Sequence, residues 1–375
     1  MKKKVIAAGH ICIDVTPAFP DRRVSEIGEI LRPGKLVETG PADVHTGGAV
    51  ANTGLAMKIL GADVQLMGKI GRDSFGDMVR SILEKYDAAD SMICDENEST
   101  SYSVVLAVPG IDRIFLHNPG ANNSFCADDV SEEALTEASL FHFGYPPLMA
   151  GMFENGGREL IRLMKKAKAS GTATSLDLAA VDPAAPAGKQ DWEQILRDTL
   201  PYVDIFVPSI EEVCYMIDRE RFVEWQLRAG TGDITQILDF EKDIIPLAKK
   251  CMSYGVKVLL LKCGAKGMYC CTASRNGLKE LAEVTGIDTY AWADFSEFEV
   301  SYVPDRVLSG TGAGDTSIAA FLTAMLEGYG PEDSLHLAAA TGASCVAEYD
   351  ALSGLKSLEE LKARIDAGWE KYAAE

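Results

Sequence analysis

The chain alternates between continuous apolar runs and segments in which apolar residues recur every three or four positions. Residues 3–15 form an apolar run, which predicts a strand covered on both faces. Residues 49–60 are apolar nearly all round and stop at Gly61, which predicts a helix with a glycine C-cap. Residues 63–71 predict the next strand, and residues 73–86 a helix with an aspartate as N-cap.

The same alternation recurs further along the chain. Strands are predicted at 174–179, 203–209 and 257–264, with helical patterns between them. Strands separated in this way indicate crossover units and a mostly parallel sheet, so we expect a layered α/β fold. The chain of 375 residues is long for one domain but contains no segment typical of a flexible linker. A single domain over residues 1–375 is therefore favoured over two domains.

Three segments depart from this alternation of strands and helices. Residues 16–46 carry four prolines, and residues 101–118 resemble a hairpin that turns near Pro109 and Gly110. Together these two segments predict a small sheet that projects from the main body. A polar helix is predicted at 218–233, where it has the character of an insertion.

Charge and cysteine content exclude several classes of protein. The chain has 36 basic and 56 acidic residues, a net charge of −20, which would repel a nucleic acid backbone. Nine cysteines without a C-x-x-C pair indicate reduced, mostly buried thiols in a cytoplasmic protein. The N-terminal apolar run is interrupted by polar residues and does not form a signal peptide, and no run reaches the ~18 apolar residues of a membrane span.

The motif "SGTGAGDTSIAAFLTAMLEGYGP" combines a glycine-rich turn with the start of a helix. Its helical spacing places Asp315 in the first turn, after Gly310, Gly312 and Gly314. Main-chain amides from residues 311–314 can then point into one concavity, where the helix dipole adds positive potential, which predicts an anion hole. A carboxylate beside such a site is suited to accept a proton from an attacking hydroxyl. The alternative is that Asp315 only caps its helix and the glycines only make a tight turn.

A second glycine cluster lies near the N-terminus. "HTGGAVANTGLAMKILGADVQLMGKIGRDSFGD" joins Gly47, Gly48 and Asn52 at a helix start to further glycines and Asp73 after the next strand. Together with the later "GTGAGD", this pattern resembles the PfkB or ribokinase-like family of carbohydrate kinases. The resemblance implies a ribokinase-like layered α/β/α fold with a small β-sheet lid, and an ATP- and Mg²⁺-dependent kinase that phosphorylates a primary hydroxyl of a sugar or sugar-like compound.

The resemblance also implies roles for individual residues. Asp315 is the implied catalytic base, and the amides of Gly312, Ala313 and Gly314 hold the charge that develops on the phosphoryl group. For Asp14, Asn52 and Lys262, a solvated or purely structural role is the alternative. The implied acceptor ligands are Asp14, Gly47, Gly48, Asn52 and Asn122, and the implied cofactor ligands are Lys262, Gly264, Gly267, Thr311 and Asp177, with Glu212 for the metal and residues 340–350 near the adenine.

The sequence departs from the family pattern at several positions. Ser209 stands where the family usually has Asn in Asn-x-x-Glu, with Glu212 retained. Ser309 and Gly310 replace the usual Asp and Thr before the glycine turn, so activation by a monovalent cation stays open. The lid edge could also pair in a homodimer.

Two rival functions remain. A nucleoside kinase of the same family would need an apolar slot for the base, to which Phe19, Tyr102 and Phe115 could contribute. A catalytically silent sugar or nucleotide sensor is the other rival, suggested by Ser209 and Ser309. The intact Asp315 with its glycines argues against a silent protein.

Overall fold

The computed structural model describes residues 3–111 and 113–373, and it contains a central sheet of eight strands. The strands are β1 (Lys4–Gly9), β4 (Asp63–Met67), β9 (Leu140–Gly144), β10 (Ala173–Leu176), β11 (Ile205–Phe206), β12 (Val258–Lys262), β13 (Gly267–Thr272) and β14 (Ser296–Val300). Their order across the sheet is β14-β13-β12-β11-β10-β9-β1-β4. All neighbours are parallel except at β13 and β14, so the expectation of a mostly parallel sheet is confirmed.

Helices cover both faces of this sheet, because alternate strand residues point to opposite sides. In β1, Val5 and Ala7 enter one hydrophobic core, and Ile6 and Ala8 enter the other. The first core is covered by α1 (Ala56–Ile59), α2 (Ser74–Glu84), α9 (Lys279–Thr285), α10 (Thr289–Trp292), α11 (Ala313–Glu327), α12 (Pro331–Cys345) and α13 (Leu358–Asp366). The second is covered by α3 (Glu132–Glu137), α4 (Ala150–Ala169), α5 (Trp192–Thr199), α6 (Ile210–Ile217), α7 (Arg219–Ala229) and α8 (Ile245–Ser253).

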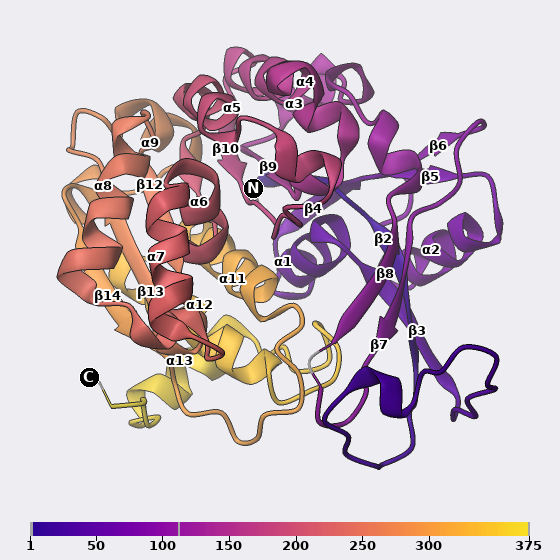
Figure 1. Ribbon diagram of the computed structural model, residues 1–375. Helices are drawn as coiled ribbons and strands as arrows, with labels where there is room; N and C mark the ends of the chain where they lie inside the picture. Colours follow the sequence, from indigo (N-terminus) through magenta and orange to yellow (C-terminus); the bar gives the residue numbers. More distant parts are fainter. Residues whose placement is uncertain (1–2, 112, 374–375) are drawn as a thin grey trace.

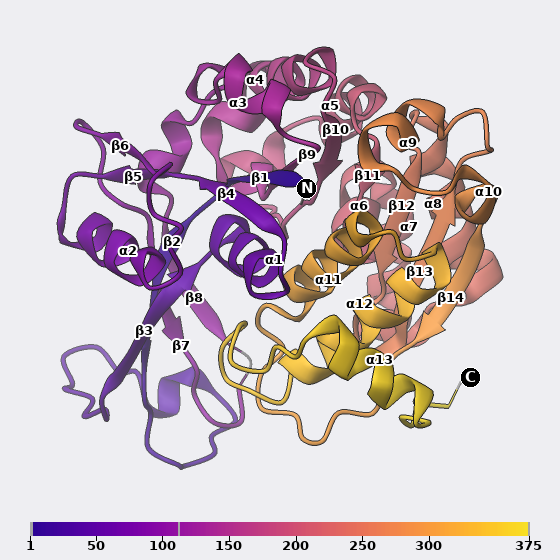
Figure 2. The same ribbon diagram turned by 180° about the vertical axis from the view of Figure 1, so that it is seen from behind.

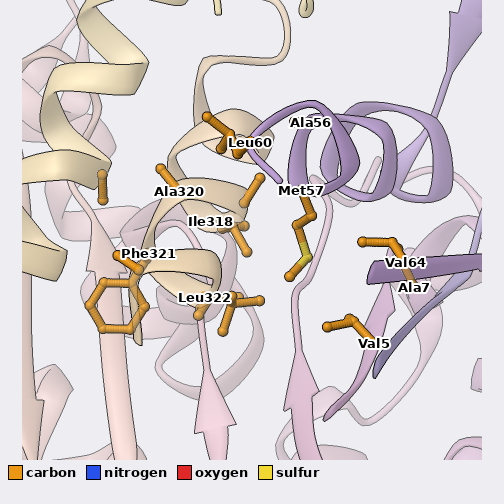
Figure 3. Packing of buried hydrophobic residues seen from close by; sticks show 14 of the residues in the cluster. Val5, Ala7, Ala56, Met57, Leu60, Val64, Ile318, Ala320, Phe321 and Leu322 are labelled. Atoms are coloured by element: carbon orange, nitrogen blue, oxygen red, sulfur yellow. The ribbon is translucent and has the colours of Figure 1, made fainter. Parts of the chain in front are cut away.

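The first core joins α1 and α11 to the sheet. Figure 3 shows Met57 of α1 between Leu322 of α11 and Val5 of β1, and all three side chains are fully buried. The layered α/β/α arrangement expected from the alternating pattern is therefore confirmed. Since α11 begins at the glycine-rich motif, this packing fixes the position of its first turn.

A second, four-stranded sheet projects from the body (Figures 1 and 2). It contains β2 (Cys12–Pro17), β3 (Ala42–Gly47), β7 (Tyr102–Leu106) and β8 (Ile114–Asn118), in the order β3-β2-β7-β8. The hairpin expected at 101–118 is present as antiparallel β7 and β8. The small sheet expected from the two irregular segments is confirmed.

Two strand predictions are wrong in the same way. The predicted strand at 3–15 ends at Gly9, which has φ of +127° and leaves no room for a side chain against Gly144. The chain then continues as β2 in the small sheet, so Asp14 does not end the first strand. The predicted strand at 63–71 likewise divides into β4 and β5 (Lys69–Gly71), which pairs with β6 (Ile93–Asp95) in a separate two-stranded sheet.

The helix predictions at 49–60 and 73–86 are confirmed. Residues 49–60 are helical as expected, although the first part, Val50–Leu55, is a π-helix that continues into α1. Asp73 caps α2 by accepting from the Gly76 amide, as predicted. A second π-helix spans Phe240–Ile244, and the 3₁₀ helices are Ile27–Glu29, Gly120–Ser124, Ala127–Asp129, Pro146–Leu148, Pro186–Lys189, Leu200–Tyr202, Ile234–Ile237 and Gly264–Lys266.

The polar segment at 218–233 contains α7, as predicted, and is tied to the body. Trp225 is fully buried, and its Nε1 donates to Asp243, which also pairs with Arg228. All nine cysteines are free thiols, and six of them are buried. Within the part of the chain that the structure describes, no helix combines the length and apolar character needed to cross a bilayer.

Candidate active site

The candidate site lies where the carboxyl ends of three parallel strands of the central sheet meet the start of α11. Tyr145 follows β9, Asp177 follows β10, and Lys262 ends β12. In parallel α/β sheets this edge is where ligands bind, because loops and helix N-termini gather there. The sequence motifs predicted separately at 177, 262 and 315 are therefore brought together by the sheet.

The glycine turn before α11 is shaped by close packing. Gly312 is the N-cap, with φ of +76°, and a Cβ at this position would lie 2.2 Å from the Ala351 Cβ. A Cβ on Gly314 would lie 3.6 Å from the Lys262 Nζ, so the first turn of α11 faces the lysine ammonium. Backbone amides, the helix dipole and a lysine thus combine at one place, which suits a phosphate group.

Asp315 does not cap its own helix, so that alternative is wrong. The N-cap position makes no side-chain hydrogen bond, and the Asp315 carboxylate, only 5% exposed, accepts hydrogen bonds from other segments. Asn52 Nδ2 donates to Oδ2 at 3.0 Å, and Thr53 Oγ1 donates to Oδ1 at 3.3 Å. The Tyr145 hydroxyl donates to both oxygens, at 2.7 and 2.8 Å. Asn52, an implied acceptor ligand, and Asp315, the implied base, therefore lie in direct contact.

Tyr145 and Thr53 are site residues that the sequence analysis missed. Tyr145 has φ of +65° and ψ of +41°, a left-handed conformation that is rare for a residue with a side chain and recurs at functional sites. Desolvation, and then the neighbouring Asp315, raise the pKa of Tyr145 well above its usual value, so the phenol keeps its proton. The feature of the sequence that could have indicated Tyr145 is its position in "FHFGYPP", between a buried strand and two prolines.

Asp177 and Lys262 form a buried ion pair beside the glycine turn. The Lys262 Nζ lies 2.9 Å from Asp177 Oδ1. Burial raises the pKa of Asp177 to about 7, against the opposing effect of Lys262, while nearby Glu212 and Asp315 raise it further. Lys262 is therefore paired with a carboxylate and not merely solvated.

Glu212 lies next to this pair, at the start of α6. Its Oε2 accepts from the Ser209 amide at 3.0 Å, and Ser209 Oγ accepts from the Glu212 amide at 3.4 Å. This reciprocal arrangement is a capping box. It gives Ser209, which replaces the asparagine of the family pattern, a structural role at the helix start.

Stability should depend on pH through Asp177. Its folded pKa of about 7 exceeds the ordinary 3.8, so the unfolded chain releases a proton that the folded chain keeps. The contribution of this group to the free energy of unfolding is fully present below about pH 4 and is lost as the pH rises through about 7. Urea titrations at about pH 5 and pH 8 should therefore show a smaller stability difference for Asp177→Asn than for wild type. Equal differences would mean that Asp177 ionises normally.

The predicted acceptor ligand Asp14 lies on the small sheet, in a row that faces the site. It pairs with Ser103, which in turn pairs with His117, so the three side chains share one face. His117 Nε2 lies 3.4 Å from His10 Nε2, and the His10 ring centroid is 6.2 Å from that of Tyr145. Polar groups thus form a continuous row from Asp14 to Tyr145 and Asp315.

Gly47 and Gly48 line the same row. A Cβ on Gly47 would lie 2.1 Å from Asp14 Oδ2, and a Cβ on Gly48 would lie 2.5 Å from the His10 carbonyl oxygen. His10 is buried, its Nδ1 has no hydrogen-bond partner, and desolvation lowers its pKa to about 3. A neutral imidazole with a spare polar atom therefore stands beside the predicted acceptor ligands.

Asn122 is fully buried, and its side chain forms hydrogen bonds with main-chain groups. Its side chain accepts from the Ile11 amide at 3.1 Å and donates to the carbonyls of Ile11 and Pro119. It therefore fixes the turn at which the chain passes from β1 to β2. Its role as a substrate ligand stays a prediction.

A cavity of about 390 Å³ opens on the other side of the glycine turn. Its lining includes Lys262, Gly264 and Gly267, which are implied cofactor ligands, and Gly314 of the glycine turn. Gly342, Ala343 and Val346, from the segment expected near the adenine, supply one wall. Tyr302 and Tyr372 were not predicted and also line the cavity.

Thr311 does not line this cavity. Its amide donates to Ser309 Oγ at 3.1 Å, and its carbonyl accepts from the Cys345 thiol. Ser309 also accepts from Arg113, which belongs to the hairpin of the small sheet. These bonds fix the loop that leads into the glycine turn.

Comparisons with known proteins identify relatives over most of the chain. The family described as pfkB family carbohydrate kinase matches residues 2–358. A probable fructokinase-2 of Arabidopsis thaliana is 25% identical over 329 residues, covering 87% of this chain and 82% of the relative.

Solved structures show the same fold at low sequence identity. An Arabidopsis thaliana ribokinase complexed with ribose and ATP has a TM-score of 0.69 and 21% identity, covering 97% of this chain and 98% of that chain. An E. coli protein solved with ATP and Mg²⁺ has a TM-score of 0.67 and 20% identity, covering 98% of this chain and 100% of that chain. The fold of the chain is thus ribokinase-like.

Proposed function

The chain belongs to the PfkB family of carbohydrate kinases and is a phosphotransferase with an alcohol group as acceptor, and we propose that it transfers the γ-phosphate of ATP to a primary hydroxyl of a sugar or sugar-like compound. The observation that carries this proposal is the buried Asp315 carboxylate between the polar row and the glycine turn. A base at this junction can reach an acceptor on one side while phosphate binds on the other.

The proposed reaction is an in-line displacement. Asp315 takes the proton of the acceptor hydroxyl as its oxygen bonds to the γ-phosphorus, and the bond from phosphorus to the leaving ADP oxygen breaks. The amides of Gly312, Ala313 and Gly314, together with Lys262, stabilise the negative charge of the transferring group. Holding both reactants in place contributes much of the rate, because phosphoryl transfer needs alignment more than covalent help.

The nucleotide is assigned to the cavity beside the glycine turn. A Cβ on Gly264 or Gly267 would clash with Thr235 or with the Glu299 carbonyl oxygen, so backbone forms the cavity floor there. Magnesium, when bound, neutralises phosphate charge, and the carboxylates of Glu212 and Asp177 are the oxygen donors that would hold it. The Arabidopsis thaliana ribokinase complexed with ribose and ATP supports ATP as the nucleotide. Thr311 would contribute by shaping the glycine turn before α11.

The acceptor is assigned to the space between the two sheets. We propose that Asp14 and Asn52 bind its hydroxyls, while Gly47 and Gly48 let it approach the main chain. The small sheet then acts as a lid that excludes water within a single domain of residues 1–375. A homodimer through edge strand β8 is a further proposal, supported by Phe115 and Leu116, which are 54% and 55% exposed there.

The nucleoside kinase is the less favoured rival. Phe115 pairs with Val105, three residues from Tyr102, so Tyr102 and Phe115 point to opposite faces of the small sheet. Tyr102 packs against Phe75, with ring centroids 5.3 Å apart, and cannot share one slot with Phe115. The nucleobase of a nucleoside substrate would therefore need another apolar surface.

The proposed function is tested by following ADP release with Mg²⁺ and ATP across a panel of sugars, sugar-like polyols and nucleosides, in sodium and in potassium buffers. Turnover with a sugar supports the proposal, and turnover only with a nucleoside supports the rival. Binding of a sugar without turnover of any acceptor would instead identify a silent sensor. The comparison of the two buffers decides whether a monovalent cation activates the enzyme.

A further prediction concerns the C-terminal segment, which lies beyond the matched residues 2–358. Lys371 pairs with Tyr302, and Tyr372 lines the cavity assigned to the nucleotide. Replacing Tyr372 with alanine should raise the KM for ATP by about fivefold to tenfold, the usual size for one lost aromatic contact, and leave kcat nearly unchanged. Tyr290→Ala, at another exposed tyrosine, is the control. An unchanged KM for ATP in Tyr372→Ala would place the nucleotide elsewhere.

A further inference from the structure

The carboxylate of Asp315 has three hydrogen-bond donors, which together contact both of its oxygens. A carboxylate offers about four lone-pair positions, two on each oxygen. Oδ1 accepts from Thr53 and Tyr145, and Oδ2 accepts from Asn52 and Tyr145. These donors supply three protons, and the Tyr145 oxygen, 2.7 and 2.8 Å from the two carboxylate oxygens, lies in front of both. An acceptor hydroxyl that approaches from this side can therefore bind the base only if the phenol moves away.

The three donors differ in how firmly they are held. Asn52 and Thr53 are buried on the helical segment that packs against α11 and β1, so they move only with the core. Tyr145 is partly exposed, and it lies in the connection after β9. Its backbone conformation is strained for a residue with a side chain, and its single proton is shared between two oxygens. Tyr145 is thus the donor that is most easily displaced.

We propose that the Tyr145 hydroxyl occupies the place of the acceptor hydroxyl on Asp315 until an acceptor displaces it. This inference rests on the proposed function, in which Asp315 is the base. A phenol in this position keeps water away from the base while ATP is bound, and so suppresses transfer of the phosphoryl group to water. Tyr145 then acts as a specificity-determining residue, because only an acceptor that replaces its hydrogen bonds gains access to Asp315.

The phenol is suited to this role because it does not itself react. Desolvation, and then the negative charges of Asp315, Asp177 and Glu212, raise the pKa of the phenol and so oppose its ionisation. A protonated phenol donates to the base but is a weak nucleophile. Asp315 itself lines neither the cavity assigned to the nucleotide nor the cavity that Asn52 lines.

The test is Tyr145→Phe, which keeps the ring and removes only the hydroxyl. We expect hydrolysis of ATP without acceptor to rise at least about fivefold and the KM for the acceptor to fall by a similar factor, because one hydrogen bond no longer has to be exchanged. Tyr254→Phe is the matched control, since the Tyr254 hydroxyl also donates to a carboxylate, that of Glu193, outside the site. That control should match wild type in both measurements.

Three results would overturn the inference. If Tyr145→Phe lowers kcat but leaves hydrolysis and the acceptor KM unchanged, Tyr145 only positions the base. If wild type itself phosphorylates nothing in the panel, the proposed function fails and the inference fails with it. A wild-type structure with bound acceptor provides a measurement that does not depend on the variant folding. It should place the acceptor hydroxyl on Asp315 with Tyr145 moved off at least one oxygen, and a phenol still bonded to both oxygens would contradict the inference.

Discussion

Replacing Asp315 with asparagine is expected to lower kcat by at least ~10²-fold while leaving acceptor affinity nearly intact. The asparagine side chain has almost the same shape as the aspartate side chain, and its oxygen can still accept from Asn52 or Thr53. The packing around the first turn of α11 is therefore retained. The basic group is lost, and the acceptor hydroxyl must then lose its proton without help. Steady-state kinetics measure kcat, and titration calorimetry measures acceptor binding.

The matched control is Asp333→Asn. Asp333 also lies in the first turn of a 15-residue helix, α12, and its carboxylate pairs with Lys362 away from the site. This variant should keep wild-type turnover. Near-normal turnover in Asp315→Asn would remove the base assignment, and a large loss of acceptor binding would make Asp315 a binding residue instead.

The second large effect is expected for Lys262→Met, which removes a cation from both the ion pair and the proposed phosphate site. Turnover should fall at least ~10²-fold, the usual loss when one donor to a developing charge is removed. Stability should fall by less than the about 3–5 kcal/mol typical of a broken buried pair. The reason is that Asp177, whose pKa is already about 7, can take up a proton when its partner is lost.

Lys168→Met separates the two effects of Lys262. Lys168 also pairs with a buried aspartate, Asp204, at 2.7 Å, but the pair lies at the amino ends of β10 and β11, away from the site. This control should lose stability and keep its turnover, as measured by urea unfolding and initial rates. If Lys262→Met loses only stability, the lysine is a structural partner of Asp177 and has no part in transfer.

Local chemistry made part of the site predictable from the sequence. The glycine turn and Asp315 occupy one short motif, where helical spacing and the need for bare backbone can be read directly. Lys262 and Asp177 each lie near the carboxyl end of a predicted strand, and the rule that parallel strands share a carboxyl edge places them on the same side of the sheet.

The remainder depends on contacts between distant segments. Nothing local reveals that Tyr145 reaches Asp315 across 170 positions, because that contact depends on how α11 packs on the sheet. The break after Gly9 was missed for a similar reason, since Gly144 on the neighbouring strand leaves no room for a side chain there. Tyr372 joins the cavity only through pairing of the C-terminal segment with residues 301–303.

The account depends most on the claim that the start of α11 holds the phosphoryl group beside Asp315. The most direct measurement is a crystal structure with a non-hydrolysable ATP analogue and Mg²⁺. We expect the γ-phosphate oxygens within about 3 Å of the amides of residues 312–314, on the side of the helix start that faces Lys262. A triphosphate bound away from these amides, or with its γ-phosphate directed away from Asp315, would contradict the account.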